Sequence, residues 1–335
     1  MAADRHDLPD AQWRLLEPLL PDRTPRRGGL WADHRPVIDG VIWRVRTGRP
    51  WRDLPAAYGP WQTVYDRHRR WSADGTWDKF LDALRTECDL DLTAEEGEWA
   101  VSIDSSIMRA HHDAAGARGE PPRDVPPERL AAQVPPSPRE RGRSGGQQGH
   151  LDLDGARRQA SRDREGLGRS RGGLSSKVHL LADARCRPLV AAVSPGQRGD
   201  TLAYPVLMGR LRIARRGCGR PRTRPDRVLG DKAYSSRPLR ADLRRRHITA
   251  TIPVSDDQAG HRRKRGSRGG RPYVFDAERY KGRNVVERTF SKLKDNRAFA
   301  MRTDKRGYIF AGTVAVAALR IWLRDLARRD PSDTP

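Results

Sequence analysis

The sequence predicts an α/β protein in which a mixed sheet flanked by helices follows a small all-helical region. Residues 1–92 carry repeated i, i+3, i+4, i+7 apolar spacings and seven of the nine tryptophans. From residue 93 to residue 328 the patterns run strand, hairpin, helix, strand, helix, strand, helix. Strands that alternate with helices in this way form a sheet with helices on its faces. A chain of 335 residues is long enough for these two domains.

The N-terminal region contains three short amphipathic helical patterns. The first, at 38–45, stops before Gly48, and glycine is typical of helix C-termini. Two more lie at 61–68 and 77–84. Short helices joined by tight turns predict a helix-turn-helix-like unit. Its polar faces are basic, and we expect them to contact double-stranded DNA through Arg44, Arg46, Arg49, Arg52, Arg67 and Arg70. The alternative is that these arginines form an ordinary solvated face.

The second domain opens with a strand at 98–108, in which apolar residues alternate with small ones up to Asp104. The stretch that follows, 113–172, is rich in proline, glycine and arginine and has almost no apolar periodicity. We interpret it as a disordered or loosely ordered insertion.

The remaining elements return to regular patterns. Two apolar runs, "SSKVHLLAD" and "RPLVAAVSPG", predict a hairpin, and a helix at about 200–215 follows. A strand in "DRVLGDKAYSS" ends at Gly230-Asp231, before a helix at 236–246 and the strand "ITATIPV". The run "HRRKRGSRGGRP" predicts a flexible basic loop, from which we expect DNA contacts by Arg262, Arg263 and Lys264. Two long helices, 280–298 and 306–328, end the chain.

The charge of the chain indicates a polyanionic partner. Its formal net charge is +23, with 66 Lys+Arg against 43 Asp+Glu. A mutational bias explains arginine over lysine, but it does not explain cations over acids. Lysine is rare, and half of the lysines lie in two short segments, so we expect DNA contacts from Lys232, Lys292 and Lys294.

The three scattered cysteines favour a reducing compartment and no zinc site. The N-terminus has no apolar run of the kind a signal peptide needs. The apolar run at 308–323 is too short to span a membrane, so it predicts a buried helix. We therefore expect a cytoplasmic, nucleoid-associated protein without a membrane partner.

Three acids follow or occupy elements that could converge: Asp104, Asp231 and Glu287. Each alone has a local explanation as a cap, a turn residue or an ion pair. Together they match the needs of phosphodiester cleavage, because two Mg²⁺ ions held by carboxylates can activate the attacking oxygen and stabilise the leaving one. No P-loop or G-x-S-x-G motif competes with this interpretation. His111-His112-Asp113 is the only close histidine pair, and we interpret it as polar loop residues because adjacent side chains point apart on regular backbone.

The stretch "YKGRNVVERTFSKLK" at 280–294 places Glu287 among basic residues. On one continuous helix, Tyr280, Arg283, Glu287 and Lys294 share a narrow face, beside an apolar stripe that could pack on the sheet. Three interpretations stay open: an intrahelical salt bridge, a capping box with Asn284, and a metal ligand. A helix that starts late would take Tyr280 and Arg283 off this face.

The same stretch resembles the Y-x2-R-x3-E-x6-K signature of bacterial insertion-sequence transposases of the DDE class, in the group numbered four and five. "SIDSSIMRAHHDAAGAR" is similar to that family's first aspartate block, and "VLGDKAYSS" is similar to its second. The segment from "IDGVIWRVRTGRPW" to "SADGTWD" resembles the helical domain of group five. The resemblance covers nearly the whole chain, and only about 120–166 departs from it.

The resemblance implies a ribonuclease H-like core that cleaves DNA with two Mg²⁺ ions per active site, with Mn²⁺ as an alternative. It implies Asp104, Asp231 and Glu287 as metal ligands and catalytic residues. It also implies that Tyr280, Arg283 and Lys294 hold the transposon end near the scissile phosphate. The partners implied are terminal inverted repeats, target DNA and further copies of the chain in a homodimer or higher oligomer.

The function expected is therefore that of a DNA transposase that cleaves the ends of its own insertion sequence and transfers their 3′-OH groups to target DNA. Two alternatives remain: a domesticated ribonuclease H-like DNA nuclease, and a DNA-binding repressor derived from an inactive transposase. Three acids kept beside DNA weigh against the repressor.

Overall fold

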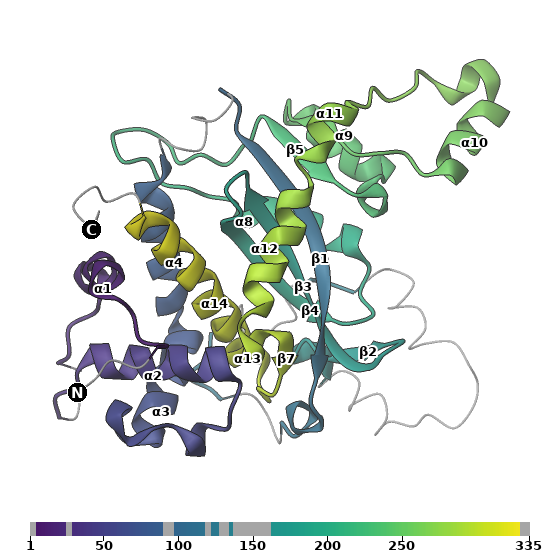
Figure 1. The fold of residues 1–335 in the computed structure, drawn as a ribbon. Helices are drawn as coiled ribbons and strands as arrows, with labels where there is room; N and C mark the ends of the chain where they lie inside the picture. The colour runs from purple at the N-terminus through teal and green to yellow at the C-terminus, as the bar shows by residue number, and fades with distance from the viewer. Residues whose placement is uncertain are drawn as a thin grey trace, which may run out of the picture.

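The strand β1 (Ala100–Ala110) forms the centre of a mixed sheet in the computed structural model, which describes residues 5–24, 29–89, 97–117, 122–126, 134–136 and 162–328 (Figure 1). On one side β1 pairs antiparallel with β3 (Gly173–Asp183), which pairs antiparallel with β4 (Pro188–Pro195). On the other side it runs parallel to β5 (Arg227–Gly230), which runs parallel to β6 (Thr249–Thr251). Two short strands complete the sheet: β2 (Gly168–Ser170) pairs antiparallel with β3, and β7 (Met301–Arg302) pairs parallel with β1. The predicted mixed sheet and its hairpin are confirmed.

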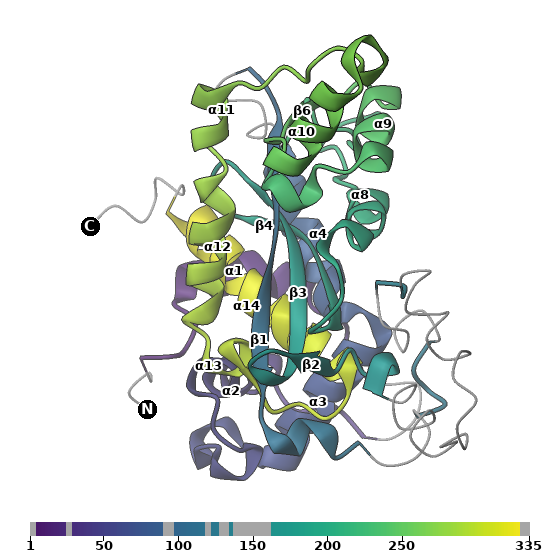
Figure 2. The same ribbon diagram turned by 90° about the vertical axis from the view of Figure 1, so that its right-hand side faces the viewer.

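Helices cover both faces of this sheet. The helix α12 (Asn284–Lys294) lies on one face, whereas α8 (Tyr204–Arg210) and α9 (Arg237–Arg245) lie on the other (Figure 2). The helix α12 packs on β1 and β3 because Val286, Phe290 and Leu293 bury one stripe of its surface. The helix α14 (Gly307–Ala327) is buried over most of its length and packs on β4 and α12. It is the buried helix that the apolar run at 308–323 predicts.

The N-terminal unit consists of α1 (Asp10–Leu16), α2 (His34–Thr47), α3 (Trp61–Asp74) and α4 (Thr76–Glu87), with short 3-10 turns η1 (Glu17–Leu19), η2 (Trp51–Asp53) and η3 (Ala56–Tyr58). Asp33 caps α2 by accepting from the Arg35 N–H, and Gly48 ends it in the left-handed conformation, with φ 68°. Trp71, Trp77 and Phe80 stack edge to face between α3 and α4. The predicted helices therefore form.

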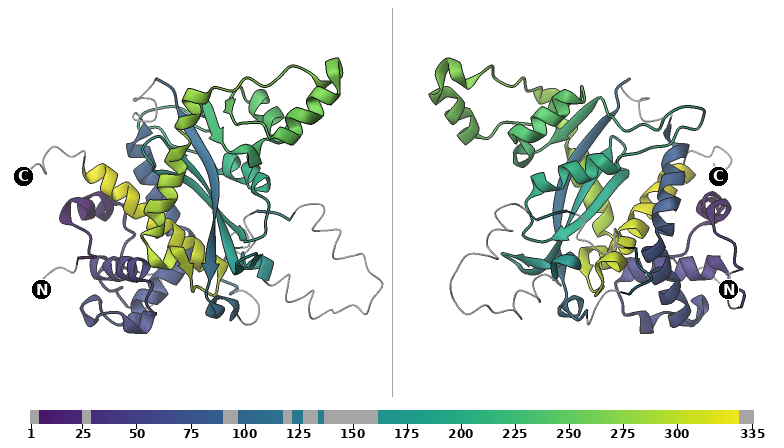
Figure 3. Two further views of the ribbon diagram at one scale, coloured as in Figure 1. Left: turned by 45° about the vertical axis from the view of Figure 1, so that its right-hand side comes forward. Right: turned by 180° about the vertical axis from the view of Figure 1, so that it is seen from behind.

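This unit shares its core with the sheet domain. All four helices contact α14, which lies between them and the sheet (Figures 1 and 3). One continuous cluster of buried side chains extends from Leu8 to Leu323. The domain boundary predicted near residue 92 lies outside the described residues.

Three predicted boundaries differ from the structure. The helix expected at 280–298 is divided into α11 (Ala277–Lys281), α12 and α13 (Arg297–Ala300), with a turn at Gly282-Arg283. The basic run at 261–272 is partly helical, because α10 (Asp256–Lys264) covers its first residues and η8 (Gly266–Gly269) follows. The helix expected at 200–215 is short, since η6 (Asp200–Leu202) precedes α8 and the latter ends at Arg210.

The prediction that 113–172 is a disordered or loosely ordered insertion is wrong at both ends, where η5 (His112–Ala115) and β2 form. At its start, η5 buries Ala114. At its end, Glu165 accepts hydrogen bonds from the Arg306 guanidinium and the Gly307 N–H, which fixes the entry to β2 and the start of α14. Of the rest, 118–121, 127–133 and 137–161 lie outside the described residues.

Within the described ranges, no helix combines the length and apolar character that crossing a membrane requires.

Candidate active site

The register of the sheet brings Asp104 and Asp231 to the same level. Ile103 of β1 pairs with Gly230 of β5 in parallel, so the next residue of each segment is an aspartate. The close approach needs a glycine, because a Cβ at Gly230 would lie 2.9 Å from Cγ2 of Ile103. Asp231 then leaves the strand and caps η7 (Lys232–Tyr234), with the Ala233 N–H donating to its Oδ1 at 2.9 Å. Two carboxylates therefore stand side by side at the end of one ladder.

Glu287 reaches the same region from α12. The Arg283 guanidinium donates to Oδ2 of Asp104 at 3.1 Å and also to Oε1 of Glu287. One cation thus joins an acid of the central strand to an acid of the helix. The Glu287 side chain keeps 53% of its surface exposed, whereas Asp104 keeps 20%. A large ligand can therefore reach Glu287, whereas Asp104 is mostly covered by the protein.

The electrostatics show that the three acids interact. Burial raises the pKa of Asp104 above its usual value, and repulsion from Asp231 and Glu287 acts in the same direction. The Ser105 N–H, 2.7 Å from Oδ1, and the Arg283 guanidinium lower this pKa. Three carboxylates with a single guanidinium, which contacts two of them, favour further positive charge at this site.

This donor set fits a hard divalent cation. Mg²⁺ and Mn²⁺ take carboxylate oxygens and keep several waters, so a few rigidly placed acids suffice. Asp104 lies within β1 just past the end of its ladder with β5, Asp231 follows β5 directly, and Glu287 comes from a helix anchored on the sheet. The guanidinium between Asp104 and Glu287 shows that this pair already accommodates a cation.

Of the two local interpretations of Glu287, the structure supports the salt bridge and contradicts the capping box. The salt bridge is present, because Arg283 and Glu287 pair at i, i+4. The capping box is not: Asn284 is the first residue of α12, the N-cap is Arg283, and no side chain caps the helix. The salt bridge and a metal would use the same two carboxylates, because the Arg283 guanidinium also contacts Asp104.

A fourth acid, Asp200, borders the site, and a Gly-Asp pair after β4 is its one mark in the sequence. The Ser105 hydroxyl donates to Oδ1 of Asp200 at 2.5 Å, and Nζ of Lys177 donates to the same oxygen at 3.0 Å. His179 lies behind them, with Nδ1 3.8 Å from that oxygen, and burial lowers its pKa to about 4. Asp200 therefore holds the side chain of Ser105, the residue directly after Asp104.

The other residues of the signature take separate positions. Tyr280 belongs to α11, so it does not share the helical face that the sequence predicted, yet its ring lies 5.7 Å from the Arg283 guanidinium and 5.2 Å from the Phe275 ring. Lys292 and Lys294 are exposed in the last turn of α12, and Lys232 is exposed next to Asp231.

Arg44 and Arg67 cannot contact phosphates as predicted, because both are buried. Arg44 donates to Oδ1 of Asp304 at 3.1 Å and to the Thr303 hydroxyl at 2.7 Å, and it lies over the Trp51 ring. Arg67 contacts Nδ1 of His34 at 2.7 Å, and burial lowers its pKa to about 10. Arg44 thus joins α2 to the segment before α14, and Arg67 is held inside the helical unit.

The remaining predicted DNA contacts are at the surface. Arg49, Arg52 and Arg70 are exposed, and Arg46 is half-buried with Nη1 donating to the Asp295 carbonyl at 3.1 Å. The helix α10 buries no side chain and projects from the body of the molecule (Figures 1 and 3). It carries Arg263 and Lys264, which are exposed, and Arg262, which is half-buried.

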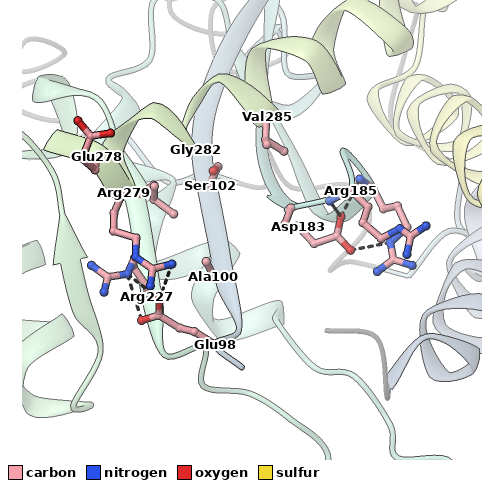
Figure 4. A pocket seen from close by; sticks show the side chains of 13 residues that line it. Glu98, Ala100, Ser102, Asp183, Arg185, Arg227, Glu278, Arg279, Gly282 and Val285 are labelled. Carbon is pink, nitrogen blue, oxygen red and sulfur yellow. Dashed lines mark hydrogen bonds and ion pairs between the residues drawn. The ribbon is translucent and has the colours of Figure 1, made fainter. Parts of the chain in front are cut away.

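A cavity of about 170 Å³ lies elsewhere, between β1, β5 and α11 (Figure 4). Its charges are paired: Glu98 accepts from Nε of Arg227 at 3.0 Å, and Asp183 accepts from Nε of Arg187 at 2.6 Å. The cavity includes none of the three acids. Because these charged side chains pair with one another, we interpret the cavity as a structural feature and not as the active site.

Comparison with known proteins supplies the family context. The family described as "Putative transposase of IS4/5 family" matches residues 8–81, and the family described as "Transposase DDE domain" matches residues 95–322. The DDE domain implies a ribonuclease H-like fold, which the mixed sheet fits. No solved structure matches the chain.

Three relatives are similar to parts of this chain, and two of them come from insertion elements. An uncharacterized protein of Sinorhizobium fredii, y4sN, is 38% identical over 34% of this chain and 86% of its own length. An uncharacterized 16.2 kDa protein of insertion element IS402 from Burkholderia cepacia is 37% identical over 30% of this chain and 71% of its own. The "Putative transposase for insertion sequence element IS6501" of Brucella ovis is 32% identical over 45% of this chain and its whole length.

Proposed function

This chain belongs to the transposases with a DDE domain, and from that premise we propose that it cleaves the ends of its own insertion sequence and transfers their 3′-OH groups to target DNA. The observation that supports the proposal is that Asp104 lies between the other two acids: the sheet register places it beside Asp231, and one guanidinium joins it to Glu287. Within this proposal two divalent ions, Mg²⁺ or Mn²⁺, would supply an activated attacking oxygen and a stabilised leaving oxygen.

Each acid has a role that follows from its position. Asp104 and Asp231 would hold the ions against the rigid end of the β1–β5 ladder, since neither can move without the sheet. Glu287 would complete the ligand set from the open side, where DNA must enter. Arg283 keeps Asp104 and Glu287 close while they carry like charges. Its position beside both acids also suits a contact with the scissile phosphate.

The exposed cations around the site give the DNA a path. Tyr280 would position Arg283 through ring contact, and Lys294 would contact the phosphate backbone of the transposon end. Non-specific contacts would come from the surface groups Lys232, Lys292, Arg46, Arg49, Arg52, Arg70, Arg262, Arg263 and Lys264. Paired ends call for a homodimer or a higher oligomer, and chromosomal DNA as substrate places the protein at the nucleoid.

The test uses purified full-length protein with Mg²⁺ and labelled duplexes that carry the element's own ends. Cleavage followed by joining to a second duplex supports the transposase. Cleavage without joining would indicate a nuclease, and binding without either would indicate a repressor.

Glu287→Gln isolates the site. It keeps the size of the side chain but loses the charge that binds the metal, so cleavage should collapse while metal-free DNA affinity stays the same or rises. Glu278→Gln is the matched control, because Glu278 is an exposed glutamate of the neighbouring helix that pairs locally with Lys281. Substantial Mg²⁺-dependent cleavage by Glu287→Gln would contradict the assignment.

A further inference from the structure

A second cluster of potential metal ligands lies where β1 ends. We infer that His111, His112 and Asp113 form a site for a divalent transition metal that prefers imidazole, with Zn²⁺ as its representative. Among the described residues, these three offer donor atoms that all lie within 4.8 Å of one another. His111 lies seven positions beyond Asp104 along extended chain, roughly 23 Å at about 3.3 Å per residue. The two sites are therefore separate, and this one does not depend on the proposed function.

The spacing of the donor atoms suits a tetrahedral metal. Nδ1 of His111 lies 3.1 Å from Oδ2 of Asp113, and Nε2 of His112 lies 3.0 Å from its Oδ1. Ligands that bind zinc at about 2.0–2.1 Å with tetrahedral angles stand about 3.4 Å apart. These two contacts lie within a few tenths of an ångström of that separation, and all three donor atoms lie within 4.8 Å of one another.

The backbone explains why adjacent histidines meet. On a regular strand their side chains would point apart, but the strand stops at Ala110 and η5 begins at His112. The turn brings the two rings to a centroid distance of 4.0 Å. This geometry removes the reason for interpreting the pair as unrelated loop residues.

The turn is anchored before any metal arrives. The His111 N–H donates to the Arg302 carbonyl at 2.8 Å, next to the pairing of β1 with β7. Ala114 is fully buried and fixes the other end of the cluster. Little chain entropy would therefore be lost on binding, which favours affinity.

The chemistry of the cluster separates it from the carboxylate site. Two imidazoles and one carboxylate suit zinc, copper or nickel, whereas Mg²⁺ prefers oxygen ligands. The His111, His112 and Asp113 side chains are 42%, 83% and 55% exposed, which leaves positions on the metal for water or another ligand. His111 and Asp113 also border a cavity of about 840 Å³ whose wall includes Arg52, Lys305 and Arg306. An anionic ligand on the metal would offset these neighbouring charges.

The test is calorimetric titration of chelator-treated protein with Zn²⁺, using the full-length chain without a histidine tag and in excess Mg²⁺. One Zn²⁺ should bind per chain. His112→Gln and Asp113→Asn should each weaken binding at least about tenfold, because even outer-shell changes have effects of that size. Both side chains are exposed, so both variants should fold, and circular dichroism would verify this.

Three controls keep the result specific. His261→Gln removes an exposed histidine of α10, Cys218→Ser removes the exposed thiol, and Glu287→Gln removes a triad carboxylate. All three should bind Zn²⁺ like the parent protein. The inference would be overturned if the parent protein did not bind Zn²⁺, or if His112→Gln and Asp113→Asn bound it as tightly as the parent protein. A loss of binding in Cys218→Ser would overturn it as well.

Discussion

The helical unit and the site formed by Asp104, Asp231 and Glu287 use arginine in opposite ways. In the helical unit, Arg44 is buried with Asp304 and packs over an indole, so its charge holds two parts of the core together. At the end of the sheet, Arg283 contacts Asp104 and Glu287, and the glutamate is open to solvent. The first cation is sealed in a structural pair. The second lies where a ligand can reach its partners.

This difference shows that net charge alone does not locate a binding surface. Within one short segment of the helical unit, Arg44 faces the interior whereas Arg49 and Arg52 face solvent. A buried pair has no charge left to offer a polyanion, but breaking it leaves an unpaired ion inside the protein. The following substitutions test whether stability and chemistry separate in this way.

The largest effect is expected at the carboxylates. Asp104→Asn and Asp231→Asn should each reduce Mg²⁺-dependent cleavage by about a thousandfold or more, as losing a charge-stabilising group does in other active sites. Neither should lower the melting temperature much, because burial and mutual repulsion already disfavour the charged form of Asp104. The double variant should cost little more than either single one. Asp257→Asn, at an exposed aspartate of α10, is the control and should cleave like the parent protein. A cleavage rate near that of the parent in Asp104→Asn would show that Asp104 has no role in catalysis.

The next largest effect is expected at Arg44. Arg44→Met should reduce the free energy of unfolding by about 3–5 kcal/mol, because Asp304 would remain as a buried, unpaired carboxylate. Arg49→Met, at an exposed position of the same segment, should change it by less than about 0.5 kcal/mol. Urea denaturation of both variants measures the difference. Equal stability of the two would mean that Arg44 is not structural.

A pH dependence should come from Asp39, a buried acid of α2. Burial raises its pKa to about 6, and its Oδ1 accepts the Leu8 N–H at 3.0 Å. Because the folded pKa exceeds the unfolded one, the folded state holds the proton more tightly. Its contribution to stability is therefore full below about pH 4 and is lost as the pH rises through about 6. Asp39→Asn should remove up to about 3 kcal/mol of this dependence.

The measurement for Asp39 is the unfolding free energy between pH 4 and pH 8. Asp53→Asn, at an exposed position of the same unit, should follow the parent protein. If the parent and Asp39→Asn show parallel pH profiles, the carboxyl of Asp39 is not the group that titrates.

The smallest effect is expected at the surface arginines of the helical unit. Replacing Arg46, Arg49 and Arg52 with glutamine should reduce the slope of log K against log salt for duplex binding by about 0.9 per lost contact. The unfolding free energy should hardly change. An unchanged salt slope would show that DNA does not cross this surface.

Much of the fold was predictable because it depends on local pattern. The alternating apolar residues of β1, the turn between β3 and β4, and the glycine at the end of α2 act over a few neighbours. The break between α11 and α12 was less predictable. Gly282 and Arg283 keep helical dihedral angles, so the local sequence does not forbid one continuous helix.

The residues available for chemistry could be identified from local pattern: two acids at the ends of predicted strands and one inside a basic helical signature. The sequence by itself also determined the helical N-terminal unit and the mixed sheet, since hydrophobic periodicity specifies both. Only the tertiary structure decided which charges meet. The parallel register places Asp104 beside Asp231, and α12 brings Arg283 to two of the acids. It also decided that Arg44 is buried and that His111 and His112 share one turn. The register and the burial of Arg44 depend on contacts between distant segments, about which local spacing carries no information, and the histidine turn is held in place by the distant Arg302 carbonyl.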